Sequence, residues 1–245
     1  HIDLVNFRNY KELTVSFSGK INCFTGDNAS GKTNLLDAIY YLAFSKSYFS
    51  QVDQENIHHG ESFFVINGMF ERDGTNENIY CGVKRDDKKQ FRRNKKEYSR
   101  LSDHIGLIPL VIVSPYDSNL IAEGSEERRK FLNSVISQYD KAYLDDVLNY
   151  NRVLKQRNAL LKEFAFHGKF DVETLIIYDE KLAQLGEPIF RKRKDFCKKL
   201  VPAMQDYYHD ISGGKDAISL EYRSQLDGND YKQLLKSARD RDIAI

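Results

Sequence analysis

Residues 26–33 read Gly-Asp-Asn-Ala-Ser-Gly-Lys-Thr and fit the phosphate-loop pattern G-x-x-x-x-G-K-[ST]. An apolar stretch at 21–24 precedes the loop and predicts a strand. Apolar residues spaced three or four apart follow the loop and predict a helix. In that context successive backbone N–H groups and a helix N-terminus point at one anion. A plain glycine turn would leave Lys32 at a helix start, where a cation is unfavourable without an anion beside it. The loop and its flanks therefore predict a nucleotide-binding site.

The residue types within the loop indicate which ligand it binds. Lys32 supplies a point charge for the β- and γ-phosphates, and the hydroxyl of Thr33 is placed to bind Mg²⁺. We therefore expect ATP and Mg²⁺ as cofactors. The candidate residues of the loop are Gly26, Asp27, Asn28, Ala29, Ser30, Gly31, Lys32 and Thr33.

The bulk composition restricts the classes of partner. The net charge is +1, so any attraction to nucleic acid has to be local. The three cysteines are widely separated, which favours reduced thiols over a disulfide framework or a zinc site. The sequence has no run of 18 apolar residues and no visible signal peptide, so we expect a cytoplasmic protein without a membrane span. Because the chain starts at His1 inside a strand-like pattern, we expect a few native residues to precede it.

Residues 1–124 alternate between strand and helix signals, and we expect them to form an ATPase domain. Strands are expected over 2–17, with a turn at Asn9-Tyr10, and over 63–70 and 79–84, with a turn at Asp73-Gly74. The apolar run at 107–113 predicts a further strand, buried on both faces. The pairs His58-His59 and Asp103-His104 lack a third ligand at suitable spacing for a metal and are expected at the surface.

The apolar spacing changes to three or four residues after Gly124. Ser125 is expected to cap one long helix that closes near Gly168, about 60 Å in length at ~1.5 Å per residue. A second helix is expected from Val172, so that residues 125–210 form an antiparallel helical hairpin. Residues 211–245 are expected to return toward the ATPase domain, with strand-like alternation at 218–222. The fold class predicted is α/β, an ABC-type phosphate-loop ATPase head with a long helical hairpin inserted.

Several segments in a fixed order resemble one protein family. They are Asn6-Phe7-Arg8-Asn9-Tyr10, the phosphate loop with Asn34-Leu35-Leu36-Asp37-Ala38-Ile39-Tyr40, Ser114-Pro115-Tyr116-Asp117, Gly124-Ser125 with Arg128-Arg129, and Leu154-Lys155-Gln156-Arg157-Asn158. Their order and spacing resemble the N-terminal portion of the RecF family of bacterial recombination-repair proteins. The resemblance extends over essentially the whole chain.

The resemblance implies an SMC-like ABC-type ATPase head that forms a homodimer on binding ATP and acts with RecR and RecO. It also implies binding to single-stranded DNA and to junctions with double-stranded DNA. At such junctions the family helps to load recombinase during DNA repair, replication restart and the SOS response. By the same resemblance Arg8 and Asn9 lie near the nucleotide, and Asn34 lies just behind the phosphates. From the residues alone, a solvated arginine, a turn asparagine and an ordinary helix residue are alternative interpretations.

Two further motifs that ABC-type hydrolysis requires are imitated rather than present. Ile211-Ser212-Gly213-Gly214-Lys215 imitates the signature motif, but strand-like alternation follows it, so we interpret it as a glycine turn that leaves the helical region. Leu144-Asp145-Asp146 imitates a Walker B strand but lies within a helical pattern, so we interpret both acids as solvated helix residues. We therefore expect a fragment that contains no catalytic residue and, without Walker B, does not turn ATP over efficiently.

Residues 84–100 hold nine Lys or Arg side chains and three acidic ones, on an expected hairpin that turns at Asn94-Lys95. Alternate residues of a strand share a face, so Lys89, Phe91 and Arg93 are expected to point the same way. A positive ribbon suits contacts to DNA phosphates, whereas a solvated hairpin that protects a sheet edge is the alternative. The candidate DNA-binding residues are Lys88, Lys89, Arg92, Arg93, Lys95 and Lys96. A second basic cluster, 191–194 with Lys198 and Lys199, is expected to be the solvated face of a helix.

Three functions remain open on the residues. The first is a DNA-repair ATPase in which ATP closes a dimer clamp and hydrolysis releases it. The second is a phosphotransferase, which predicts a compact lid in place of a long hairpin. The third is a non-catalytic DNA-binding or protein-interaction module with a vestigial phosphate loop.

Overall fold

The computed structural model describes residues 1–167 and 171–243. The chain divides into a sheet unit, His1–Asp117, and a helical unit that begins at Ser118. The sequence predicted this boundary at Gly124, but it lies earlier, between Asp117 and Ser118. The reason is that the short helix after Asp117 already packs with the helices that follow.

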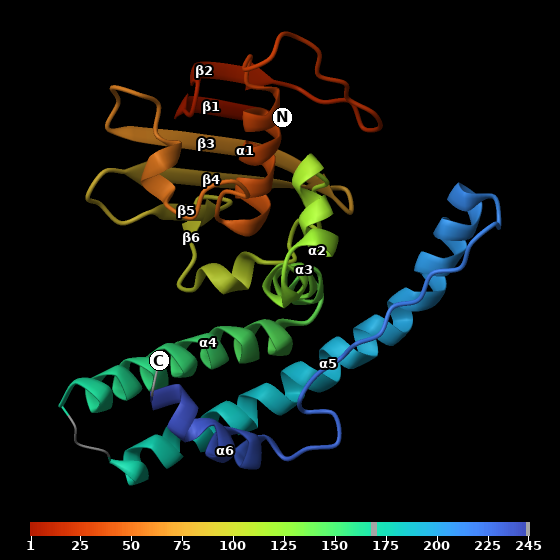
Figure 1. The fold of residues 1–245 in the computed structure, drawn as a ribbon. Coiled ribbons are helices and arrows are strands. Elements are labelled where there is room, and N and C mark those ends of the chain that lie inside the picture. The colour runs from red at the N-terminus through yellow and green to blue at the C-terminus, as the bar shows by residue number, and fades with distance from the viewer. Residues whose placement is uncertain (168–170, 244–245) are drawn as a thin grey trace. The chain divides into compact units, whose positions relative to one another are not determined.

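The sheet unit is built on one six-stranded antiparallel sheet (Figure 1). Its order is β2-β1-β3-β4-β5-β6. The strands are β1 (Ile2–Phe7), β2 (Tyr10–Val15), β3 (Phe63–Arg72), β4 (Thr75–Lys84), β5 (Gln90–Arg93) and β6 (Lys96–Glu97). The three predicted hairpins are present, but the first turns at Arg8-Asn9, one residue before the predicted Asn9-Tyr10, because Tyr10 already pairs with Phe7. Their turns contain residues with positive φ, including Asp73 (51°) and Asn94 (49°), as tight turns between antiparallel strands require.

One face of the sheet forms the core against α1 (Lys32–Phe44), which crosses the strands in Figure 1. Alternate residues of the central strands point to this face, and Phe64, Ile66 and Ile79 are fully buried there. Phe64 meets the ring of Tyr41 from α1 edge to face, with centroids 5.6 Å apart. The helix that follows the phosphate loop is therefore held by the hydrophobic core of the sheet.

Short 3₁₀ helices complete the sheet unit at Asp53–Asn56, Leu101–His104 and Pro115–Ser118. His104 is buried, which corrects the expected surface position. Its Nε2 lies 2.6 Å from the carbonyl oxygen of Leu42 and its Nδ1 lies 2.9 Å from the hydroxyl of Tyr98. Burial lowers the pKa of this imidazole, and the hydrogen bond to Leu42 only partly opposes that effect.

Two strands predicted in this unit are wrong. Residues 21–24 and 107–113 are not in any ladder of the described chain. Part of each segment faces solvent, with Ile21 89% and Val113 82% exposed. Other apolar side chains there, including Phe24 and Ile112, are half-buried and pack against the core. Apolar composition favours an extended backbone, but a strand forms only where a neighbour accepts its hydrogen bonds.

The helical unit contains α2 (Asn119–Ala122), α3 (Ser125–Ser137), α4 (Lys141–His167), α5 (Val172–Ser212) and α6 (Tyr231–Ile243). The single helix predicted from Ser125 is therefore wrong, because it is divided between α3 and α4. Asp140 explains the break, since its carboxylate accepts a hydrogen bond from the N–H of Tyr143 at 3.0 Å and so starts a new helix. Gly124, and not Ser125, occupies the N-cap of α3. The predicted closure at Gly168 lies outside the described residues.

The predicted antiparallel pair is present as α4 and α5, which lie side by side in Figure 1. Ion pairs join Asp140 to Lys192 at one end and Arg157 to Asp179 near the other, so the two helices run in opposite directions. Residues 218–222, predicted as a strand, have no regular structure. Of the segment after residue 210, α6 packs against α4 and α5. Across the described residues, every helix is too short or too polar to cross a bilayer.

Candidate nucleotide site and basic hairpin

The phosphate loop lies at the start of α1, in the position that the sequence predicted. Gly31 occupies the N-cap with a φ of 106°, and Gly26 and Ala29 also have positive φ (146° and 66°). The first N–H groups of a helix have no intrahelical acceptor, and no side chain of the described residues caps this helix end. A hollow of about 200 Å³ opens there, lined by Asn28, Ala29, Gly31, Lys32, Thr33 and Asn34. The loop thus offers uncapped amides to an anion.

The ammonium group of Lys32 is held over the loop itself. Its Nζ donates to the carbonyl oxygens of Gly26 at 2.8 Å and Asp27 at 2.7 Å. These bonds place a positive charge beside the uncapped helix start, where it repels the helix dipole unless an anion is bound. Thr33 is exposed next to Lys32, so its hydroxyl is accessible to a cation. The residues therefore fit a nucleotide phosphate with a bound Mg²⁺.

The turn between β1 and β2 covers the end of the loop. The amide of Asn9 donates to the carbonyl oxygen of Ser30 at 3.2 Å, and its oxygen accepts from the amide of Asn34 at 2.7 Å. A Cβ on Gly31 would lie 2.5 Å from Nδ2 of Asn9 and 2.6 Å from the hydroxyl of Tyr10. Asn9 and Asn34, both predicted near the nucleotide, are therefore brought together at the loop, and glycine is required at position 31.

Arg8, also predicted near the nucleotide, is bound to a carboxylate that the sequence analysis missed. Its guanidinium pairs with Asp37 of α1 at 2.8 Å and donates to the hydroxyl of Ser47 at 3.0 Å. Asp37 is fully buried and also accepts from Ser47 at 2.8 Å and from the N–H of Tyr48 at 2.7 Å. A carboxylate on the buried face of a helix needs such partners, which is the signal that could have identified it.

The basic hairpin corrects part of the predicted DNA surface. Lys89 and Arg93 do share a face with Phe91, but that face is the inner one, where Phe91 is buried. Nζ of Lys89 bonds to Asp53 at 2.7 Å and to the carbonyl oxygen of Ser45 at 2.8 Å. Arg93 forms a two-bond ion pair with Glu77 and thereby lowers the pKa of that carboxyl. Lys89 is therefore largely enclosed by the protein, with 17% of its side chain exposed, whereas Arg93 is paired but keeps 41% of its side chain exposed.

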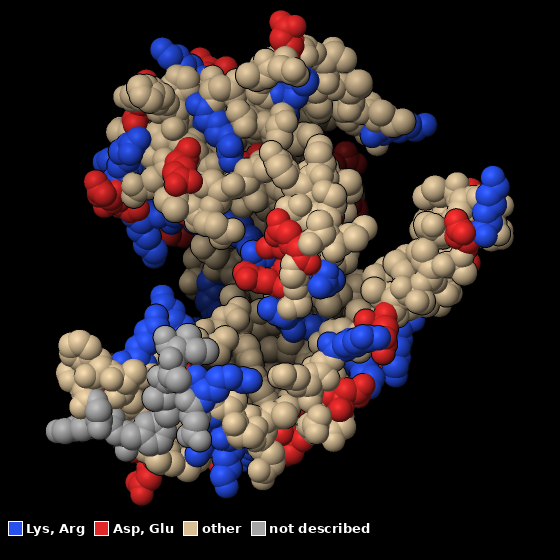
Figure 2. Space-filling model, viewed as in Figure 1, with Lys and Arg blue, Asp and Glu red and all other residues tan. Residues whose placement is uncertain are grey.

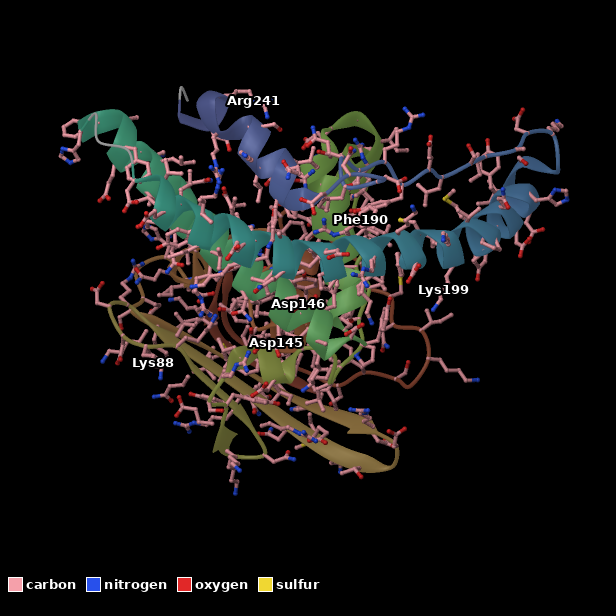
Figure 3. The ribbon with its side chains drawn as sticks, turned by 90° about the horizontal axis from the view of Figure 1, so that it is seen from below. Lys88, Asp145, Asp146, Phe190, Lys199 and Arg241 are labelled. Carbon is pink, nitrogen blue, oxygen red and sulfur yellow. The ribbon has the colours of Figure 1, made fainter. Side chains whose placement is uncertain are left out.

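The other four predicted DNA residues remain accessible. Lys88, Lys95 and Lys96 are exposed, and Arg92 on the outer face lies over the ring of Tyr80, 5.4 Å from its centroid. Figure 3 shows Lys88 on the turn between β4 and β5. On the face that Figure 2 shows, Lys and Arg atoms lie beside Asp and Glu atoms, so this face is mixed in charge rather than uniformly basic.

The two imitations of hydrolysis motifs lie where the sequence predicted. α5 ends at Ser212, and Gly213 closes it with a φ of 63°, so the glycines there terminate a helix and do not begin one. Asp145 and Asp146 lie on α4 (Figure 3). They are half-buried rather than fully solvated, and burial raises the pKa of Asp146.

Three of the six cations in the second basic cluster on α5 pair with acidic neighbours. Arg191 pairs with Glu187 and Lys194 with Asp227, in addition to the pair between Lys192 and Asp140. Arg193 donates to the hydroxyl of Tyr143 and to the side chain of Asn133. The paired cations of this cluster therefore contribute to packing within the helical unit.

Comparisons with known proteins give a family model and several named relatives. A family model described as an AAA domain matches residues 1–240. The DNA replication and repair protein RecF of Bacteroides fragilis is 51% identical over 98% of the chain, and that of Flavobacterium johnsoniae is 48% identical over 100% of it. The chain spans 65% of the first relative's length and 68% of the second's.

Solved structures give the same result. Two structures of the recombination mediator protein RecF, described as RecF-ATPrS and RecF-ATP, superpose with TM-scores of 0.91 and 0.87. Both are 31% identical to the chain, and they cover 99% of it. The chain in turn covers 68% and 67% of those chains. The α/β fold of an ABC-type ATPase head, predicted from the sequence, is confirmed.

Proposed function

The chain belongs to the RecF family of DNA replication and repair proteins, and from that premise we propose that it forms the ATP-binding part of a DNA-repair ATPase. The observation that carries the proposal is the uncapped start of α1 with Lys32 held over it. Two related structures described as RecF-ATP and RecF-ATPrS support ATP as the nucleotide.

In this proposal each loop residue has a defined task. The uncapped amides at the start of α1 donate to the phosphate oxygens, and Lys32 neutralises the β- and γ-phosphates. Thr33 contributes its hydroxyl to Mg²⁺, which completes the charge balance around the phosphates. Gly31 allows the turn of β1 and β2 to approach the loop, which a side chain at that position would prevent.

Binding is separated from turnover in the proposed function. The glycines at 213–214 end a helix and the acids at 145–146 lie inside one, so neither pair supplies a signature motif or a Walker B strand. We therefore propose that the present chain binds ATP without turning it over efficiently. Turnover would require the remaining part of the longer relatives.

The proposal extends to DNA and to protein partners. ATP would close a homodimer that clamps DNA, and the exposed cations of the hairpin would contact phosphates without reading base sequence. Membership of the family is what supports the proposed recognition of junctions, the loading of recombinase and the action with RecR and RecO.

Titration of ATP with Mg²⁺ into the protein tests the nucleotide site. Lys32→Ala should weaken binding by at least about 100-fold, because about 2.7 kcal/mol corresponds to that ratio and a charge-assisted phosphate contact is lost. Lys20→Ala, which removes an exposed lysine from the segment before the loop, is the matched control and should change nothing. Equal affinities for the wild type and Lys32→Ala would reduce the loop to a structural turn.

A further inference from the structure

Asp37 is the buried centre of a polar network that ends on the phosphate loop. It is 0% exposed and accepts from three groups: Arg8, Ser47 and the backbone N–H of Tyr48. Arg8 belongs to the turn between β1 and β2, and Ser47 and Tyr48 belong to the segment after α1. One carboxylate on α1 therefore joins a turn and a loop that are far apart in sequence.

The guanidinium of Arg8 makes its contacts with other groups of the protein. One nitrogen serves both Asp37 and Ser47, and the group lies 6.0 Å from the ring centroid of Phe7 and 5.9 Å from that of Phe49. Among the described residues Nε of Arg8 has no hydrogen-bond partner, and the atom is buried by protein. The backbone of Arg8 has a φ of 51°, which a side chain anchored in this way helps to maintain.

Asn9 transmits the position of this turn to the loop. It follows Arg8 directly, donates to Ser30 at the end of the loop and accepts from Asn34 in the first turn of α1. The turn is thus fixed at one side by Asp37 and at the other by the loop.

We propose that Asp37 is a positioning residue for nucleotide binding, which acts through Arg8 and Asn9 to hold the phosphate loop in its binding shape. The inference rests on the proposed function. It differs from the expectation that Arg8 and Asn9 lie near the nucleotide as contact residues, because their side chains are used in contacts within the protein.

The physical reason is preorganisation. A loop that is already ordered loses less conformational freedom when it binds phosphate, so its affinity is higher for the same contacts. Removing the charge of Asp37 leaves the half-buried guanidinium of Arg8 without its counter-ion, which is unfavourable. The turn then shifts toward conformations that hydrate the arginine, and Asn9 leaves the loop.

A double-mutant cycle separates positioning from direct contact. Asp37→Asn and Arg8→Ala should each weaken ATP binding about tenfold, or about 1.4 kcal/mol, and the double variant should be no weaker than either. Glu77→Gln is the matched control, because it neutralises a buried partner of an arginine in the same unit without touching the turn. A further tenfold loss on adding Arg8→Ala to Asp37→Asn would overturn the proposal, because Arg8 would then contact the nucleotide itself.

Amide hydrogen exchange in the absence of nucleotide gives a second readout. Asp37→Asn should raise the exchange rate of amides 27–34, whereas Glu77→Gln should leave it unchanged. If this rise occurs but the wild type binds no ATP, the proposed function fails, and what remains is that Asp37 orders the loop. Unchanged exchange and unchanged affinity in Asp37→Asn would refute the positioning role while the nucleotide site stands.

Discussion

Asp37 in the sheet unit and Asp179 in the helical unit are both buried carboxylates paired with arginine, yet their surroundings differ. Asp37 is 0% exposed and supports a turn and a loop beside the phosphate site. Asp179 is 3% exposed and pairs with Arg157 of α4 at 2.7 Å and with Arg239 of α6 at 2.8 Å, so it joins three packed helices.

The contrast shows that a buried carboxylate paired with arginine can support helix packing in one unit and the shape of a binding loop in the other. Breaking a buried ion pair costs free energy in either place, because the remaining charge is left uncompensated. Around Asp179 the cost falls on helix packing, and around Asp37 it falls on the shape of a loop. Changes at Asp179 should therefore be measured as a loss of stability, and changes at Asp37 as a loss of ligand affinity.

The largest expected effect is on the helical unit. Asp179→Ala leaves Arg157 and Arg239 without this acceptor and should lower the free energy of unfolding by about 4 kcal/mol. Urea unfolding, with hydrogen exchange of peptides from α4 to α6, measures the loss. Glu180→Ala removes the next carboxylate, an exposed partner of Lys232 at 3.6 Å, and should cost less than about 0.5 kcal/mol. The comparison breaks if Asp179→Ala weakens ATP binding without lowering stability.

Gly31→Ala should lower ATP affinity at the nucleotide site rather than the stability of the helical unit. The added methyl group meets Asn9 and Tyr10 in a backbone conformation that L-residues avoid, a strain of about 2 kcal/mol. We expect ATP affinity to fall by about tenfold or more, because the loop and turn must separate. Gly60→Ala is the control for backbone strain alone, since Gly60 also has a positive φ (87°) but open space around it. Equal ATP affinities in both variants would contradict the fit of the turn on the loop.

Acidic pH should weaken the sheet unit more than the helical unit. Burial lowers the pKa of His104 below 6.5, so the unfolded chain binds a proton more readily than the folded one. Stability should therefore be constant above about pH 7 and fall as the pH drops through 6.5, by at most about 1.4 kcal/mol per pH unit. His104→Gln should flatten urea midpoints measured between pH 7 and 5.5. His167 and His209 of the helical unit are exposed, and their replacement by Gln should leave the slope unchanged.

The smallest effect concerns the hairpin. Arg92→Ala should reduce the salt dependence of DNA binding by about one unit of log–log slope, if this residue contacts a phosphate. Fluorescence anisotropy with labelled DNA at several salt concentrations measures the slope. Lys89→Ala should leave the slope unchanged and lower stability instead, because it breaks the bond to Asp53. If Lys89→Ala instead lowers the slope and leaves stability unchanged, Lys89 is a DNA contact and the present assignment is wrong.

Local patterns in the sequence were sufficient for much of the fold. The phosphate loop, the three hairpins and the helix ending at Gly213 depend on residue spacing and on turn residues within a few positions. Short-range backbone preferences determine these features, so the sequence alone identified them. The pairing of α4 with α5 followed from the apolar periodicity of two consecutive segments.

Only the tertiary structure decided which of these segments and side chains have partners. The apolar runs at 21–24 and 107–113 are outside the ladders because a strand requires hydrogen bonds from another strand. Lys89 is withdrawn from the surface by Asp53, 36 residues away, and Asp37 gains its role from Arg8. Such contacts join positions that are distant in sequence, and the packing of the whole unit selects them, so no local pattern predicts them.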